Sequence, residues 1–265
     1  MHSRFEEVSQ TTGTCKDKSN CYGGFARVLH VIREARKAAA DGTGPPVLYL
    51  NAGDTYTGTS WFSVHKWKIA ADFMNLLHPD VATFGNHDFD YGVAGLVPFL
   101  RAATFPIVVS NLNFTKEPEL MATNVTKSFV LDVSGFKIAV IGYLTTDTAE
   151  QSNSEGVIFY DEIEYVKAES ERLDKAGVKI IIALGHSGYE VDKKVAAEVP
   201  LVDLVVGGHT NTFLWNGPQP DIEEPEGPYP TIIIQNSGKK VPVVQAHAHT
   251  KYMGRLNVVF SKEGD

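Results

Sequence analysis

The chain has very little cysteine and no long apolar run. Cys15 and Cys21 are its only cysteines. Two thiols are too few for a structural zinc site, so they are either free or joined in one local disulfide. No stretch of about 18 apolar residues occurs, so the sequence predicts no membrane-spanning helix. It also lacks the G-x-x-x-x-G-K-[ST] motif, which excludes a P-loop nucleotide site.

Positive charge is also in short supply. The 265 residues carry 24 basic and 32 acidic side chains, a net charge of −8, and no cluster of Lys or Arg. This balance argues against nucleic acid as a partner, because binding its backbone requires a basic surface. A small phosphorylated ligand could still bind if a metal ion or backbone N–H groups neutralised it.

Helix and strand patterns alternate along most of the chain. Near-continuous Val, Ile and Leu strands separated by helices indicate one α/β domain with a buried, mostly parallel sheet. The expected helices are 23–40, 61–77, 93–102, 162–176 and 189–199. The expected strands are 47–50, 81–84, 107–110, 136–142, 178–184, 202–206, 231–235, 241–249 and 255–260.

Four of these strands run into loops in which a glycine closely precedes Asp, Asn or His. Any one of these loops would serve as a turn, but four at strand ends favour a shared site. Open parallel sheets place their sites at the carboxyl ends of the strands. Imidazole and oxygen ligands without thiolate suit zinc, manganese or iron. The residues brought to this edge would be Asp54, Asn86, His87, His186, His209 and Asn211.

The motifs in these loops carry a family resemblance that runs across the whole chain. They are Gly53-Asp54, Gly85-Asn-His-Asp-Phe-Asp90, Gly185-His-Ser-Gly188 and Gly207-Gly-His-Thr-Asn-Thr-Phe213. Together they resemble the N-terminal metallophosphoesterase domain of the 5′-nucleotidase family, in particular animal ecto-5′-nucleotidases and secreted salivary apyrases. The resemblance implies that residues 1–265 form a calcineurin-like α/β domain, a four-layer α/β/β/α sandwich.

The resemblance also implies a centre of two divalent metal ions, in the first place zinc. Asp54 would bridge the ions, which lie about 3.5–4 Å apart in such sites and together activate water and clamp phosphoryl oxygens. One ion would take Asn86, His186 and His209, and the other His2 and Asn211. His87 would contact the transferring phosphoryl group or the leaving oxygen, and Asp90 would fix the His87 tautomer.

The implied activity is hydrolysis of extracellular nucleoside 5′-phosphates, in the first place AMP to adenosine and phosphate. One alternative is an apyrase that hydrolyses ATP and ADP. Another is a secreted protein that binds a small-molecule nucleotide without catalysis. The choice would depend on the C-terminal domain of the family, which supplies an aromatic clamp for the base.

Three features suggest an oxidising compartment. Asn113 and Asn124 begin N-glycosylation sequons. The cysteine pair of the family matches Cys15 and Cys21, which implies a disulfide. We therefore expect an extracellular protein, secreted or anchored at the cell surface, although the chain does not open with a signal peptide.

The chain departs from the family pattern at both ends. The first family motif is Asp-x-His-x-Arg; here x is Met1, so the aspartate would precede it. We therefore expect a truncated N-terminus, an absent C-terminal domain and a chain that is inactive alone. A lipid anchor and a homodimer, both known in the family, would depend on parts outside this chain.

Two weaker patterns are also present in the sequence. Gly185-His-Ser-Gly188 resembles a serine-hydrolase elbow but has Tyr189 where glycine is required. His247 and His249 would share one face of the strand 241–249, which suits a metal, but the resemblance does not require them. We expect them to lie on an ordinary exposed strand.

Overall fold

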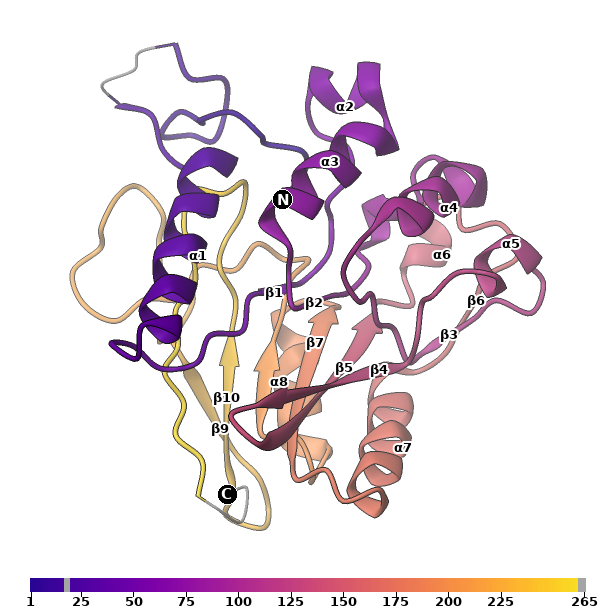
Figure 1. Ribbon diagram of the computed structural model, residues 1–265, viewed down its shortest axis with the longest axis vertical. Coiled ribbons are helices and arrows are strands. Elements are labelled where there is room, and N and C mark those ends of the chain that lie inside the picture. The colour runs from indigo at the N-terminus through magenta and orange to yellow at the C-terminus, as the bar shows by residue number, and fades with distance from the viewer. Residues whose placement is uncertain (17–19, 262–265) are drawn as a thin grey trace.

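The computed structural model describes residues 1–16 and 20–261 (Figure 1). The helices are α1 (Phe25–Ala40), α2 (Ser60–His65), α3 (Trp67–Leu77), α4 (Gly92–Ala102), α5 (Pro118–Met121), α6 (Thr148–Gln151), α7 (Glu162–Lys175), α8 (Tyr189–Glu198) and the 3-10 helix η2 (Asn86–Phe89). The strands are β1 (Leu50–Asn51), β2 (Val81–Ala82), β3 (Leu112–Asn113), β4 (Ser128–Val133), β5 (Phe136–Leu144), β6 (Ile158–Phe159), β7 (Ile180–His186), β8 (Leu204–Val206), β9 (Thr231–Ile234) and β10 (Lys240–Val244).

The larger sheet has six strands in the order β4-β5-β7-β8-β10-β9. Its four inner strands are parallel, and the edge strands β4 and β9 are antiparallel to their neighbours. Every residue of β7 is buried, as expected for a central strand covered on both faces. The parallel strands all direct their carboxyl ends toward one edge of the sheet, where the candidate site lies.

A second, smaller sheet lies over the first. Its strands β1 and β2 are parallel, with Leu50 paired to Val81. An isolated bridge between Ala82 and Ile107 adds the segment expected at 107–110. The short pair β3-β6 forms a third sheet.

Three apolar clusters separate four layers. One lies between helices α1, α3 and α4 and the small sheet, and another between the large sheet and helices α7 and α8. Between the two sheets, Val81 and Val108 pack with Val140 and Ile182. The neighbouring Ile181 belongs to the helix side, because successive side chains of a strand face opposite ways. The α/β/β/α calcineurin-like fold is thus confirmed.

Several element boundaries differ from expectation. The helix expected at 61–77 is divided at Lys66, whose φ of 54° lies outside the helical region. The strand expected at 241–249 ends at Val244, and residues 255–260 form no strand. Leu256 and Phe260 instead pack on the cluster between the sheets without a ladder of hydrogen bonds. The edge strand β4 was not predicted.

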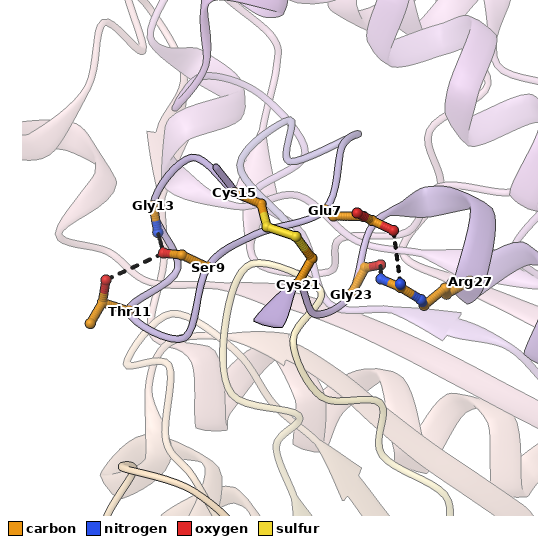
Figure 2. The surroundings of a disulfide bond; sticks show 8 residues. All are labelled: Glu7, Ser9, Thr11, Gly13, Cys15, Cys21, Gly23 and Arg27. Carbon is orange, nitrogen blue, oxygen red and sulfur yellow. Dashed lines mark hydrogen bonds and ion pairs between the residues drawn. A yellow bond between two sulfur atoms is a disulfide. The ribbon is translucent and has the colours of Figure 1, made fainter. Parts of the chain in front are cut away.

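The disulfide between Cys15 and Cys21 is confirmed, in the long loop before α1 (Figure 2). Beside it, Arg27 of α1 pairs with Glu7 at 2.8 Å and donates to the Gly23 carbonyl. These contacts tie the loop to the first helix. Among the described residues, no helix is long and apolar enough to cross a membrane.

Candidate metal centre

Asp54 lies at the middle of the site, just beyond β1. Its Oδ2 is 3.2 Å from His2 Nε2 and 3.0 Å from His186 Nε2. Burial opposes ionisation of this carboxyl, but the charge of His186, and then that of His2, holds its pKa well below the usual range. A single carboxylate oxygen is therefore flanked by imidazoles from two distant parts of the chain.

His186 is the last residue of β7, and its ring is buried. Its Nδ1 lies 2.5 Å from the Ala52 carbonyl oxygen, which fixes the ring orientation. Its Nε2 is buried and makes no hydrogen bond with the described residues, although it faces Asp54. A buried nitrogen without a partner is costly. A cation between His186 Nε2 and Asp54 would satisfy both groups.

Asn86 and His209 complete this side of the site. Asn86 begins η2 after β2, and its Oδ1 lies 3.0 Å from His209 Nδ1. The His209 ring centroid is 5.3 Å from that of His186, at an interplanar angle of 64°. Four donors from the ends of four strands therefore meet at one edge, as the loop pattern predicts.

His87 and Asp90 form a close pair beside these residues. His87 Nδ1 is 2.8 Å from Asp90 Oδ2. Ser152 Oγ donates to Asp90 Oδ1 at 3.1 Å and to the Asn86 carbonyl at 2.7 Å. The His87 amide donates to Asp54 Oδ1 at 3.1 Å, and its ring lies 5.1 Å from the His2 ring. The pair is therefore fixed next to Asp54.

Asn211 is the predicted ligand that the structure does not join to the others. Its φ is 56°, the residue is exposed, and its side chain has no hydrogen bond within the described part of the chain. Its carbonyl oxygen is 2.9 Å from His247 Nδ1. Its role as a ligand remains a prediction.

Asp88 is a site residue that sequence reasoning missed. It is buried, and it accepts hydrogen bonds from the amides of Thr55, Tyr56 and Gly85 at 2.8–3.1 Å. Burial, and then the charge of Asp54, raises the pKa of Asp88 to about 6. Its place in Gly-Asn-His-Asp was a signal, since carboxylates in such loops commonly bind backbone N–H groups.

A buried network beneath the His209 loop was also missed. Gln245 donates to Asp192 Oδ2 at 2.8 Å and to the Gly208 carbonyl at 3.0 Å, and it accepts from the Thr212 amide at 3.1 Å. Tyr143 donates to Asp192 Oδ1 at 2.6 Å. Burial raises the pKa of Asp192 to about 7. No sequence motif marks these residues.

Two glycines allow the strand-end loops to approach each other. Gly53 has a φ of 84°, and a Cβ there would lie 2.5 Å from the Gly85 nitrogen. A Cβ on Gly85 would lie 2.1 Å from Asp54 Oδ1. The glycines of these motifs are therefore required by close packing around Asp54.

The expectation for His247 and His249 is wrong, because β10 ends before them. Both have a φ of 57°, which an extended strand cannot contain. The His249 ring lies 5.5 Å from the His2 ring, whereas His247 packs against Phe213 and Tyr252. The two histidines therefore face different surroundings.

Comparison with known proteins places this arrangement in a class. Residues 1–213 match the family model of calcineurin-like phosphoesterases. The structure of a 5′-nucleotidase precursor from Thermus thermophilus superimposes with a TM-score of 0.89 at 33% identity, covering 100% of this chain and 50% of that one. The fold and the site thus define a calcineurin-like phosphoesterase.

Curated relatives narrow the class. "Protein 5NUC" of Lutzomyia longipalpis is 47% identical, the 5′-nucleotidase of Homo sapiens 42% and an apyrase of Tabanus yao 39%. Each match covers 100% of this chain but only 46–47% of the relative. The chain belongs to the 5′-nucleotidase family, matches its N-terminal metallophosphoesterase domain, and spans about half the length of these relatives.

Proposed function

We propose that the protein hydrolyses nucleoside 5′-phosphates with two divalent metal ions, in the first place AMP to adenosine and phosphate. The supporting observation is the position of Asp54 Oδ2, 3.2 Å from His2 Nε2 and 3.0 Å from His186 Nε2. Two ligands of one tetrahedral zinc ion lie about 3.3 Å apart, since each bond is about 2.0–2.1 Å. Each contact therefore has the spacing of two ligands on one ion.

In this proposal the ions occupy an inner and an outer position. The inner ion takes Asp54, Asn86, His186 and His209, and the unpartnered buried Nε2 of His186 supports it. The outer ion takes Asp54, His2 and Asn211. Imidazole and oxygen donors without thiolate suit zinc, manganese or iron, and the proposal takes zinc in the first place.

When bound, two such ions lower the pKa of water and neutralise charge on the phosphoryl oxygens. The side chains of this protein position the other groups. Asp54 joins the two sides of the site. Asp88 fixes the loop that carries Asp54, because it accepts hydrogen bonds from the Thr55 and Tyr56 amides. Because these contacts exist before substrate arrives, little reorganisation is needed during the reaction.

His87 is suited to stabilise the leaving oxygen. A protonated imidazole has N–H groups at both nitrogens. Asp90 accepts the hydrogen bond from Nδ1, and Nε2–H is then available to the phosphoryl or leaving oxygen. Distance alone groups His87 with His2 and Asp54 as a metal-binding set. Its hydrogen bond to Asp90 occupies Nδ1, and the proposal assigns the remaining nitrogen, Nε2, to the phosphoryl group rather than to an ion.

An apyrase acting on ATP and ADP is the second candidate, supported by the Tabanus yao relative. A nucleotide-binding protein without activity is the third, but an intact pair of His87 and Asp90 would serve no purpose in it. In this proposal the base clamp and the choice of nucleotide belong to residues beyond the matched half of the relatives.

We further propose an extracellular location, secreted or at the cell surface. The Cys15–Cys21 disulfide supports it, because disulfides persist in oxidising compartments. Of the two sequons, Asn124 is exposed, whereas the Asn113 amide donates to Tyr160 Oη at 3.1 Å. Glycopeptide analysis of the secreted protein should find greater occupancy at Asn124 than at Asn113. A protein with unmodified Asn124 and reduced cysteines would contradict this location.

Phosphate release from AMP and from ADP by the full-length protein tests the activity. We expect release from AMP that stops on treatment with a chelator and returns with zinc. Faster release from ADP than from AMP would favour the apyrase. Tight nucleotide binding without phosphate release would favour the binding protein.

A further inference from the structure

The segment after β10 brings a histidine to the outer side of the site. His249 lies in the part of the chain where a strand was expected, and its φ of 57° turns the backbone away from the sheet. Its ring centroid lies 5.5 Å from that of His2, at an interplanar angle of 72°. His2 is the imidazole closest to Asp54 on this side.

His249 also has an unused nitrogen. Its Nδ1 is buried and has no hydrogen-bond partner among the described residues. The neighbouring His247 differs, because its Nδ1 contacts the Asn211 carbonyl oxygen at 2.9 Å. His186 Nε2, assigned above to the inner ion, is also buried without a hydrogen bond, although Asp54 Oδ2 lies 3.0 Å away. A buried polar atom without a partner points to a missing ligand.

The spacing of the rings matches that of the inner pair. His186 and His209 have centroids 5.3 Å apart at 64°, and His2 and His249 have centroids 5.5 Å apart at 72°. Two imidazoles on one tetrahedral zinc ion have centroids about 5 Å apart, because each Zn–N bond is about 2 Å long. Both pairs therefore fit an ion between two rings.

We propose that His249 is a further ligand of the outer metal ion, beside His2. From residues 1–265 the outer ion would then take two imidazoles, the shared Asp54 and one asparagine, the same kinds of donor as proposed for the inner ion. This inference rests on the proposed two-ion function. It gives a role to a residue that no motif of the family resemblance requires.

The loop that carries His249 is held by the two residues that follow it. Thr250 Oγ1 accepts from the Gly24 amide at 2.8 Å, at the start of α1. Lys251, itself buried, donates to the Gln10 carbonyl at 2.9 Å and pairs with Asp221 at 2.7 Å. A ligand on a restrained loop loses little freedom when it binds, so His249 is prepared to coordinate.

Metal titration of the full-length protein tests the assignment. Three proteins are prepared without ions and titrated with Zn²⁺ against a competing chelator: the unmodified protein, His249→Phe and the control His65→Phe. Phe keeps the ring contact with His2 but removes the nitrogens. His65 is a suitable control because it is also a histidine in contact with an aromatic ring, that of Trp61 on α2. Cobalt substitution gives a second readout through the visible spectrum.

We expect two bound ions in the unmodified protein and in the control. In His249→Phe the weaker ion should lose at least about 10–100-fold in affinity, the cost of removing even a supporting residue. The tighter ion and its cobalt spectrum should be unchanged, and His249→Cys should recover part of the affinity. Unchanged binding of both ions would overturn the inference, as would equal weakening of both. Failure of the unmodified protein to bind any ion would refute the two-ion function itself.

Discussion

The two sides of the candidate metal centre are built differently. The inner side consists of residues at the ends of parallel strands, and Asp54, Asn86 and His186 are each at most 4% exposed. The outer side consists of His2, Asn211 and His249, which lie on segments without regular structure. The sheets thus fix one set of donors directly. The other set depends on hydrogen bonds between loops, so we expect a tight inner ion and a weaker outer one.

Replacing the residue that both sides share should have the largest effect. Asp54→Asn removes the carboxylate that is proposed to bridge the two ions. We expect phosphate release to fall by about 1,000-fold or more, since losing one charge-stabilising group already costs about 10²–10³. Rates with AMP, together with circular dichroism to confirm the fold, provide the measurement. Near-normal turnover would rule out a bridging role.

Removing one ligand from each side would separate the two ions. After dialysis against ion-free buffer, His2→Ala should retain about one ion per chain, because the inner donors are intact. His186→Ala should lose the tightly held ion, because its ring supplies a buried donor at the end of β7. Metal analysis by mass spectrometry measures both. The comparison would fail if His2→Ala lost the tight ion and His186→Ala kept it.

The His87–Asp90 pair should behave as one unit that is independent of metal content. We expect His87→Ala and the double variant with Asp90→Ala to be impaired to a similar extent, since effects of residues that act together are not additive. Steady-state rates and metal analysis of the two variants and of Asp90→Ala check this. Losses that multiply in the double variant would show that the two side chains act separately.

The smallest expected effect concerns Asp192, which supports the His209 loop on the inner side of the site. Burial raises the pKa of Asp192 to about 7, so the folded protein holds this proton more tightly than the unfolded chain does. The contribution of Asp192 to the free energy of unfolding therefore decreases as the pH rises from about 4 to about 7. Tyr143→Phe removes a hydrogen bond to the carboxylate. It should destabilise the protein by about 1.5–3 kcal/mol at pH 8.

At pH 5.5 the same substitution should cost less, because Asp192 is then largely protonated. Urea unfolding of Tyr143→Phe and of the unmodified protein at both values gives the difference. Tyr91→Phe, the matched change at an exposed tyrosine, serves as the control and should show no such dependence. An equal loss at both pH values for Tyr143→Phe would show that its hydrogen bond does not depend on the charge of Asp192.

The sequence predicted the inner side better than the outer side for a physical reason. Asp54, Asn86, His186 and His209 lie at the ends of apolar strands in two stacked sheets, and the carboxyl ends of the parallel strands of both sheets meet at the site. His2 came only from the family resemblance. His249 was misplaced because an alternating pattern at residues 241–249 suits a strand equally well. β10 ends at Val244, and the left-handed residues that follow are held by contacts with distant segments, such as that of Thr250 with the Gly24 amide.

Other features that the sequence did not predict also depend on contacts between distant segments. The edge strand β4 depends on its pairing with β5 rather than on a strong apolar pattern. Residues 255–260 have strand-like side chains, but they pack on the core without pairing. Gln245, just after β10, and Asp192, on α8, support the His209 loop from positions that look ordinary along the chain. Local patterns along the sequence predict which residues are buried. Contacts between distant segments determine which hydrogen bonds those residues make.

The left-handed backbone at the site has a consequence for the stability of the whole protein. His2, Asp54, His209, Asn211 and His249 have φ values of 51–77°, and none is glycine. Each such residue costs of order 1–3 kcal/mol, so together they cost at least about 5 kcal/mol. That is comparable with the total stability of a typical domain, about 5–15 kcal/mol. Selection for thermal resistance alone would therefore act against this backbone conformation, and the proposed hydrolytic activity would be lost while the protein became more stable.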